Sequence, residues 1–374
     1  MNTNISKTDR QINLDVLRVL SMLLIILFHS IIHSGVLEAM EIDGGFVHIV
    51  EYFFYAITQV CVNLYVLISG YFLVNSKFKV AKLIQLWLEV VFYSLVQRLI
   101  FIALGVKAFS VASVISCFFP VITGRYWFVT IYFGMYLLFP FFNIVIHAMK
   151  KEQHTALNVI LFILLSGMVT LHPSLDGLNK GGGWGIAWFI VLYFAAAWFR
   201  LYYQPNGKWV GKLLGWLGIG AFVVVCVLIT QTSTTLHKVV MNWYRYDSAP
   251  SYIASLILFA AFLNIKFMPG KLSKLVLYAS SATFGVYLIH DHADTSVWLW
   301  KSLDLPSHMS NLAFPLFQIG SVIAIFVVCV LIDLLRQITV GRVEKSRLVF
   351  KIGNKITNMF DSLMDTVESR LITK

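Results

Sequence analysis

Charged residues are scarce in this chain of 374 residues: only 13% are Asp, Glu, Lys or Arg, against about 25% in soluble domains. A soluble domain of this length needs a more polar surface to stay dispersed, so the composition excludes an ordinary soluble enzyme. Hydrophobic residues make up 59% of the chain, and the mean hydropathy is +0.79. The sequence therefore predicts an integral membrane protein.

Cysteine motifs and basic tracts are also missing. The four cysteines are scattered without a CxxC pair, which argues against a disulfide framework or a structural zinc site. The formal net charge is +11, but the lysines and arginines lie in short clusters between apolar runs. This distribution follows the positive-inside rule of membrane proteins and argues against nucleic acid as a partner. A cleaved signal peptide is not expected, because the first apolar run contains charges and lacks a small-residue cleavage site.

Ten apolar runs are long enough to approach the roughly 20 residues that a membrane-spanning helix needs. They cover approximately residues 14–34, 49–74, 83–106, 126–148, 156–173, 184–204, 213–231, 250–268, 275–291 and 311–335. We therefore predict an all-α integral membrane protein with about ten transmembrane helices. The apolar stretch 108–122 is broken by serines and Pro120, and we expect it to form a partly inserted outer loop.

Positive charge indicates the orientation of these runs. With the N-terminus inside, 21 lysines and arginines fall on the inner side and six on the outer side, so both termini are predicted to be cytoplasmic. The chain then divides into a polytopic membrane domain, residues 1–335, and a cytoplasmic tail, residues 336–374. Apolar residues of the tail recur at the spacing of an amphipathic helix on the inner leaflet: Val349, Ile352, Ile356, Phe360, Leu363, Val367 and Leu371.

The first apolar run contains the most informative polar residues. Arg18 and His29 are 11 residues apart, or three helical turns plus about 20°, so both side chains share one face about 16 Å apart. Asp15 can pair with Arg18 at the i, i+3 spacing. Charges within a bilayer are costly and tend to face a cavity or a partner. The alternative is that the two charged residues are interfacial anchors and that His29 is a packing residue.

These residues resemble a known family. Asn13-Leu-Asp-Val-Leu-Arg18 followed by His29 resembles the Arg-X10-His signature of the membrane acyltransferase-3 family. Three further segments resemble it in the expected order: Ile68-Ser-Gly-Tyr-Phe-Leu73, Tyr126-Trp-Phe-Val129 and Phe284-Gly-Val-Tyr-Leu-Ile-His290. The resemblance covers about residues 10–335. It implies ten core helices in a bacterial plasma membrane and transfer of acyl groups, often acetyl from cytosolic acetyl-CoA, onto outward-facing glycans or lipid-linked sugars.

The resemblance implies that His29 is the catalytic imidazole, with Arg18 near the inner mouth and Asp15 orienting it. Acyl transfer to a hydroxyl needs a base, and histidine suits that task. A CoA donor brings phosphate charges that favour cations at the inner face. Three lysines that follow the segment Ile68–Leu73, where the family often has arginine, are further candidates for binding the phosphates: Lys77, Lys79 and Lys82. The alternative for these three lysines is that they only set the topology.

Further candidates for acceptor binding lie in other runs. Glu89 and Arg98 are nine residues apart on opposite helical faces, so they cannot pair with each other and each needs another partner. Tyr126 and Trp127 could shape the acceptor channel, although aromatic residues are expected at a membrane interface. His290 could be a second acid–base or acceptor-binding group, or a residue of helix-end packing. No metal is expected, because the short polar cluster around His290 specifies no distant ligand and no HExxH motif is present.

We therefore predict an O-acyltransferase that uses acyl-CoA, most simply acetyl-CoA. Its expected partners are membrane lipids, a glycan or lipid-linked sugar acceptor, and a partner enzyme of surface-polymer synthesis, since no extracytoplasmic hydrolase-like domain is visible. The chief alternative is a secondary transporter or flippase, against which the absence of an internal repeat argues; a glycan polymerase is a second. The sequence leaves open the acceptor, the acyl group, and whether His29 acts as a base or carries the acyl group.

Overall fold

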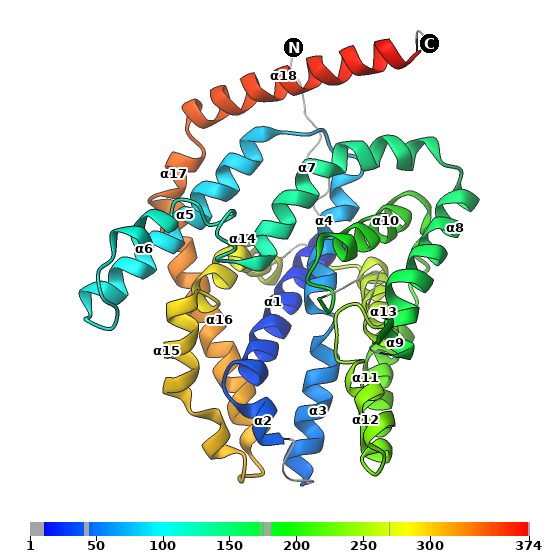
Figure 1. The fold of residues 1–374 in the computed structure, drawn as a ribbon, viewed down its shortest axis with the longest axis vertical. Helices are drawn as coiled ribbons and strands as arrows, with labels where there is room; N and C mark the ends of the chain where they lie inside the picture. The colour runs from blue at the N-terminus through cyan, green and yellow to red at the C-terminus, as the bar shows by residue number, and fades with distance from the viewer. Residues whose placement is uncertain (1–10, 41–44, 173, 176–180, 269, 373–374) are drawn as a thin grey trace.

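The computed structural model describes residues 11–40, 45–172, 174–175, 181–268 and 270–372, and within these ranges it contains helices and no strand (Figure 1). Eight helical segments are long and apolar enough to cross a membrane, and two shorter apolar helices complete the ten predicted runs. The prediction of an all-α membrane protein is confirmed. The ten segments are α1 (Ile12–Ile32), α3 with α4 (Phe46–Thr58 and Cys61–Leu73), α5 (Val80–Ala103), α7 (Trp127–Ala148), α8 through the π-helical η1 to α9 (Lys151–Phe162, Ile163–Gly167 and Met168–Leu171), α10 (Ile186–Tyr202), α11 (Val210–Thr230), α13 (Ala249–Asn264), α14 (Lys271–His290) and α16 (Phe314–Ile338).

Shorter helices connect or flank these segments. They are α2 (Val36–Met40), α6 (Val111–Ser116), α12 (Thr234–Met241), α15 (Ala293–Leu303), the 3-10 helix η3 (Leu305–His308), α17 (Gly341–Glu344) and α18 (Arg347–Ile372). The stretch 108–122, expected to be a loop, contains α6 and exposes apolar side chains such as Ile115 and Ile122.

The run predicted at 49–74 is broken into α3 and α4. The hydroxyl of Thr58 and the amide of Gln59 both donate to the carbonyl oxygen of Tyr55, at 2.9 and 3.1 Å. The backbone N–H of Gln59 bonds to Ala56, three residues back rather than four. Side chains that compete for the backbone acceptors in this way interrupt a helix without any proline.

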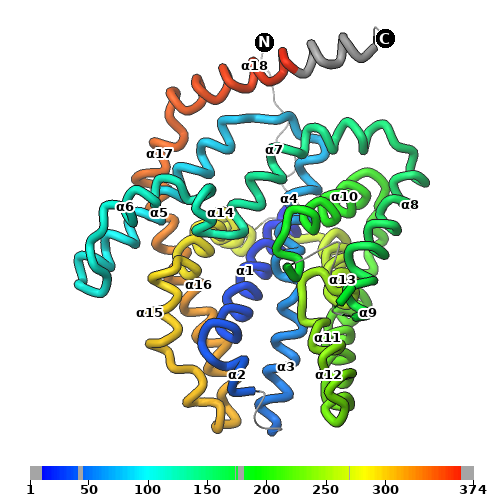
Figure 2. The backbone as a smooth tube through the Cα atoms, in the orientation of Figure 1, coloured from blue at the N-terminus to red at the C-terminus, as the bar shows by residue number. Residues whose placement is uncertain are grey.

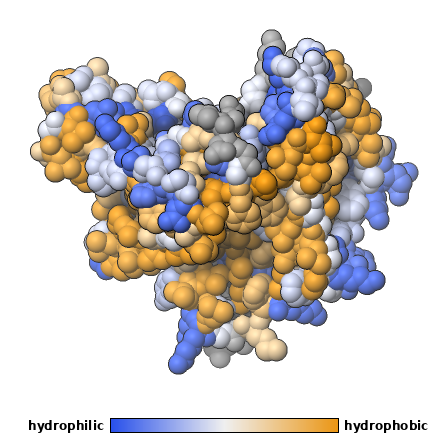
Figure 3. Space-filling view, turned by 90° about the horizontal axis from the view of Figure 1, so that it is seen from below, coloured by the Kyte–Doolittle hydropathy of each residue, from blue (hydrophilic) through white to orange (hydrophobic). Residues whose placement is uncertain are grey.

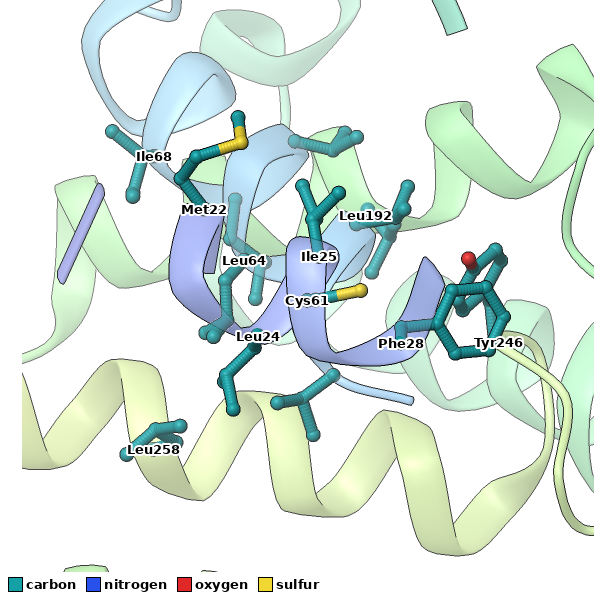
Figure 4. Close-up of a cluster of buried hydrophobic side chains, with 14 of the residues drawn as sticks. Met22, Leu24, Ile25, Phe28, Cys61, Leu64, Ile68, Leu192, Tyr246 and Leu258 are labelled. Carbon is teal, nitrogen blue, oxygen red and sulfur yellow. The ribbon is translucent and has the colours of Figure 1, made fainter. Parts of the chain in front are cut away.

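Helix α1 lies in the interior of the molecule, as the backbone trace shows (Figure 2). It packs against α3, α4, α13, α14 and α16. Apolar side chains of α1 meet those of the surrounding helices in the core (Figure 4), where the rings of Phe28 and Tyr246 lie 5.6 Å apart. The polar side chains of α1 are therefore presented to protein rather than to lipid.

Helices α10 and α13 have 17 and 16 residues, or about 25 Å of length, which is less than the roughly 30 Å of a bilayer core. Every residue of α10 is buried or half-buried. Because it is surrounded by protein, its length need not match the bilayer. The helices at the periphery of the molecule instead expose apolar residues such as Ile144, Phe222 and Val328. Figure 3 shows that apolar residues cover much of one face.

The predicted amphipathic helix of the tail is present as α18, which lies along one end of the molecule (Figure 1). Part of its apolar stripe packs on protein: Val349 is buried, and the ring of Phe360 lies 4.8 Å from that of Phe78. The hydroxyl of Thr357 accepts a hydrogen bond from the backbone N–H of Val80 at 3.0 Å. Other apolar residues of α18 are exposed and form a stripe of their own: Leu348, Ile352, Ile356, Met359 and Leu363.

Gly285 allows α14 and α16 to approach closely. A Cβ at this position would lie 2.1 Å from Oδ1 of Asp333, an atom that accepts hydrogen bonds from Tyr93 and Arg336. Gly285→Ala is therefore expected to lower the melting temperature, by overpacking worth about 1–3 kcal/mol. The control is Gly320→Ala in α16, where nothing lies within 4 Å of the added Cβ. The melting temperatures are measured in detergent by intrinsic fluorescence. Equal values for the two variants would contradict the close approach of α14 and α16 at Gly285.

Candidate functional site

Two histidines from opposite ends of the sequence meet at the ends of α1 and α14. Nδ1 of His29 lies 3.0 Å from Nε2 of His290, and both side chains are buried. Nδ1 of His290 lies 2.6 Å from the carbonyl oxygen of Val286, so this nitrogen carries the proton and donates it. Nε2 of His290 must then accept from Nδ1–H of His29. By this assignment of tautomers, Nε2 of His29 keeps a free lone pair and can act as a base.

Asp291 places a carboxylate beside this pair. Its Oδ1 lies 3.5 Å from Nδ1 of His29 and 3.7 Å from Nε2 of His33. Burial raises the pKa of Asp291, against the opposing influence of His290 and His33, and burial lowers the pKa of His33 although Asp291 opposes it. An ionised carboxylate in this position stabilises the imidazolium that forms when His29 takes a proton.

The same residues form the one group of possible metal ligands found in the described part of the chain. His29, His33 and Asp291 each offer a ligand atom, all within 4.8 Å of one another. Two imidazoles and a carboxylate are suitable ligands for zinc. However, Nδ1 of His29 already bonds to His290, and a metal on that nitrogen would replace this hydrogen bond. The sequence analysis predicted no metal, whereas this geometry offers ligands for one, so the two arrangements compete for His29.

We expect acyl transfer by the purified protein to survive metal removal, because the hydrogen bonds to His290 orient His29 without an ion. The measurement compares transfer before and after incubation with 1,10-phenanthroline and dialysis. A loss of transfer that added Zn²⁺ restores would instead make His29, His33 and Asp291 a metal site.

A narrow cavity of about 30 Å³ extends from His29 along α1 toward Arg18. It is lined by Met22, Ile25, His29, Val62, Tyr65, Trp127, Phe128, Tyr246, Phe284 and Tyr287. Met22, Ile25 and His29 lie on successive turns of the same face of α1, so the cavity follows the face that the sequence singled out. At this volume it holds about one water molecule, and a longer guest must displace side chains.

Three nearly parallel aromatic rings lie beside this cavity. The rings of Trp127 and Trp184 are 4.9 Å apart at 21°, and Tyr246 lies 6.3 Å from Trp127 at 17°. Trp184 is 45% exposed, so the group reaches the surface. The sequence indicated Trp127 as a possible channel residue, and the structure adds Trp184 beside it.

Toward the other end of α1, Arg18 is held by two partners. Its Nη1 lies 2.9 Å from Oδ1 of Asp15 and 3.1 Å from Oγ of Ser280, which itself donates to Asp15 at 2.8 Å. The predicted Asp15–Arg18 pair is confirmed. The Arg18 side chain is 28% exposed, so part of the guanidinium stays accessible. The lysines predicted to accompany it have exposed side chains in the connection from α4 and the first turn of α5: Lys77, Lys79 and Lys82.

Glu89 and Arg98 have separate partners, as their spacing predicted. Oε1 of Glu89 lies 2.8 Å from Nη2 of Arg336, which also bonds to Asp333 and Glu344, so Glu89 is tied to α16 and α17 rather than to the histidines. Nε of Arg98 lies 3.2 Å from Oδ2 of Asp294, at the start of α15 and close behind His290 in sequence.

Tyr126, directly before α7, connects that helix to α14 near His290. Its hydroxyl donates to the carbonyl oxygen of Leu288 at 2.9 Å, and its ring lies 5.8 Å from that of Tyr287. Gln97 of α5 donates to the same carbonyl oxygen at 2.9 Å. These contacts hold the end of α14, and with it His290, in place.

Sequence reasoning missed Asp291 and Tyr246 as site residues. Asp291 lies in the short polar cluster with His290, and the acid–base or acceptor-binding role that the sequence allowed there was assigned to His290 alone. Tyr246 lies in a connection between helices, where no periodic pattern marks it.

A family model described as an acyltransferase domain matches residues 11–334, from the start of α1 nearly to the end of α16. Neither a curated protein nor a solved structure matches the chain.

Proposed function

Because the chain belongs to the acyltransferase-3 family, we propose that it transfers an acyl group from cytosolic acyl-CoA to a hydroxyl of an extracytoplasmic or lipid-linked glycan. Acetyl is the simplest acyl group, and the bacterial plasma membrane is the proposed location. The observation that carries the proposal is the free Nε2 of His29, oriented through His290 and Asp291 at the end of a cavity that leads toward Arg18.

In the direct route, Nε2 of His29 removes the proton of the acceptor hydroxyl as the oxygen attacks the thioester carbonyl. The C–S bond then breaks, the acyl group forms an ester with the acceptor oxygen, and the thiolate of CoA takes the proton from His29. Asp291 lies close enough to stabilise the transient imidazolium. In the alternative route the acyl group passes first to His29, which the same lone pair permits.

The donor would enter from the cytosol. The phosphates of CoA suit Lys77, Lys79 and Lys82, whose side chains are exposed, and Arg18 can contact a phosphate or a carbonyl of the pantetheine arm. Arg18 and His29 lie about 16 Å apart along α1, a span that an extended arm can bridge. Asp15 and Ser280 fix the orientation of the guanidinium for this contact.

The acceptor would arrive at the opposite end. A sugar ring can stack on a flat aromatic surface, and Trp127 with Trp184 offers one beside His29. The proposed partner is accordingly a glycan in assembly or already at the surface, supplied by an enzyme of surface-polymer synthesis.

Mass spectrometry of surface glycans tests the proposal. It compares cells with the gene, cells without it, and cells that express His29→Ala at an equal protein level. We expect a glycan heavier by one acyl group only with the unaltered gene. Identical acylation in all three would overturn the proposal. A transporter or flippase predicts instead that the masses stay unchanged while the location of the glycan changes.

A further inference from the structure

A wide apolar groove lies on the surface of α5, α15 and α16, apart from the narrow cavity at His29. Its volume is about 460 Å³, within the range of ligand-binding pockets. The walls include Val96, Ile100 and Leu104 of α5, Trp298 of α15 and Leu335 of α16. Several of these side chains are more than half exposed, so the groove opens to the surroundings of the helices.

Three cations gather where α5 ends and α15 begins. Arg98 lies 3.2 Å from Oδ2 of Asp294, and Nζ of Lys107 lies 3.6 Å from Oδ1 of the same residue. Arg125 donates to Oγ of Ser116 at 2.9 Å. Among the described contacts of these three cations, Asp294 is the one carboxylate, so this basic cluster (Arg98, Lys107 and Arg125) has an excess of positive charge.

Two hydrogen-bond donors also face each other in this cluster. Nδ1 of His292 accepts from the backbone N–H of Asp294 at 3.2 Å, so the proton of the neutral ring is on Nε2. Its Nε2 lies 3.3 Å from Nη1 of Arg125, another donor. The ring of His292 also bonds to the backbone of Ser94, so Arg125 is the member of this pair that an anionic oxygen would contact.

The basic cluster contradicts the general distribution of charge in this chain. On the predicted orientation, only six of 29 lysines and arginines lie in outer segments. Two of those six, Lys107 and Arg125, meet Arg98 at this one point. Charges that only set the membrane topology need not cluster, and the positive-inside rule favours fewer cations in outer segments rather than more.

The cluster adjoins both the groove and the histidines. Val106, which lines the groove, directly precedes Lys107, and Thr295, also in the lining, directly follows Asp294. His292 lies two residues after His290. A phosphate held by the cluster would therefore have an apolar wall for a lipid chain on one side and the catalytic histidines on the other.

We propose that this groove binds a phosphate-bearing lipid that carries the acceptor glycan, with its phosphate on Arg98, Lys107 and Arg125 and its chain along α5, α15 and α16. The inference rests on the proposed function in one respect, namely that the bound lipid is the acceptor. The phosphate itself is unchanged in the reaction: the acyl group leaves the sulfur of CoA and forms an ester with a sugar hydroxyl.

The test measures equilibrium binding of radiolabelled farnesyl diphosphate to the full chain in phosphatidylcholine nanodiscs. Lys107→Gln and Arg125→Gln are each expected to weaken binding about tenfold or more, the effect of losing one charged contact to phosphate. Arg98→Gln should weaken it as well, but it also removes the nearer of the two cations beside the buried Asp294. If Arg98→Gln fails to fold, Lys107→Gln and Arg125→Gln still test the proposal. The matched control is Lys301→Gln, which removes an exposed cation of α15 outside the cluster.

Inorganic phosphate is added as a competitor. We expect it to displace the probe only at much higher concentration, because it cannot occupy the groove. Displacement at equal concentration would overturn the lipid site. Equal probe binding by Lys107→Gln, Arg125→Gln and Lys301→Gln would also overturn it, because it would show that the probe only partitions into the bilayer.

Acetyl transfer from radiolabelled acetyl-CoA to host lipid extract separates the two proposals. Normal transfer to the extract by Lys107→Gln and Arg125→Gln overturns binding of the acceptor through this cluster and leaves the proposed function intact. Selective binding of the probe without any transfer to the extract by the wild type keeps the phosphate site but overturns the bound lipid as the acceptor, and the mass spectrometry of surface glycans then decides the proposed function. Selective binding together with reduced transfer by both variants supports the inference.

Discussion

His29→Ala is expected to abolish acyl transfer while leaving the binding of acyl-CoA largely intact. The substitution removes Nε2, the nitrogen that the contacts with His290 and Asp291 leave free to take a proton. Loss of a general base costs about 10²–10⁴ in rate, and loss of an acyl carrier would cost the whole reaction. The measurement is transfer at equal protein concentration, with calorimetric titration of CoA on the same samples.

The control for this variant is His172→Ala. His172 ends α9, is exposed, and its Nδ1 lies 2.6 Å from Oγ of Ser174, so its loss should leave transfer unchanged. Full activity of His29→Ala would remove this histidine from the mechanism and make His290 the next candidate. If His29→Ala lost only folded protein, the histidine pair would be structural.

Arg18→Ala should weaken the binding of acyl-CoA and lower transfer. A hydrogen bond to a charged group contributes about 1.5–3 kcal/mol, so we expect the dissociation constant to rise by about tenfold to more than a hundredfold. Calorimetry with CoA measures this change, and the melting temperature reports the structural cost. That cost arises because the substitution removes the guanidinium that lies 2.9 Å from the buried carboxylate of Asp15.

Arg18→Lys separates the two effects, because lysine keeps the charge but loses the planar group that contacts Asp15 and Ser280 together. Lys212→Ala is the control for the loss of a cation on the predicted inner side, since Lys212 is half-buried and its ammonium bonds to the nearby carbonyl oxygen of Lys208. Unchanged CoA affinity in folded Arg18→Ala would show that Arg18 only stabilises Asp15.

Relations within one helix could be predicted from spacing alone. Asp15 and Arg18 pair at 2.9 Å because residues three apart on a helix are neighbours whatever surrounds them. The same local geometry placed His29 on the face of Arg18 and showed that Glu89 and Arg98 need different partners. Hydrophobicity alone located the ten apolar helices, because a bilayer demands long apolar segments.

Relations between helices could not be predicted in this way. His29 and His290 are 261 residues apart, and their contact depends on how α1 and α14 turn their faces toward each other. Such a rotation is decided by the packing of whole helices, which no periodicity in either segment encodes. For the same reason, only the tertiary structure assigned Asp291 to His29, joined Trp184 to Trp127, and tied Glu89 to Arg336.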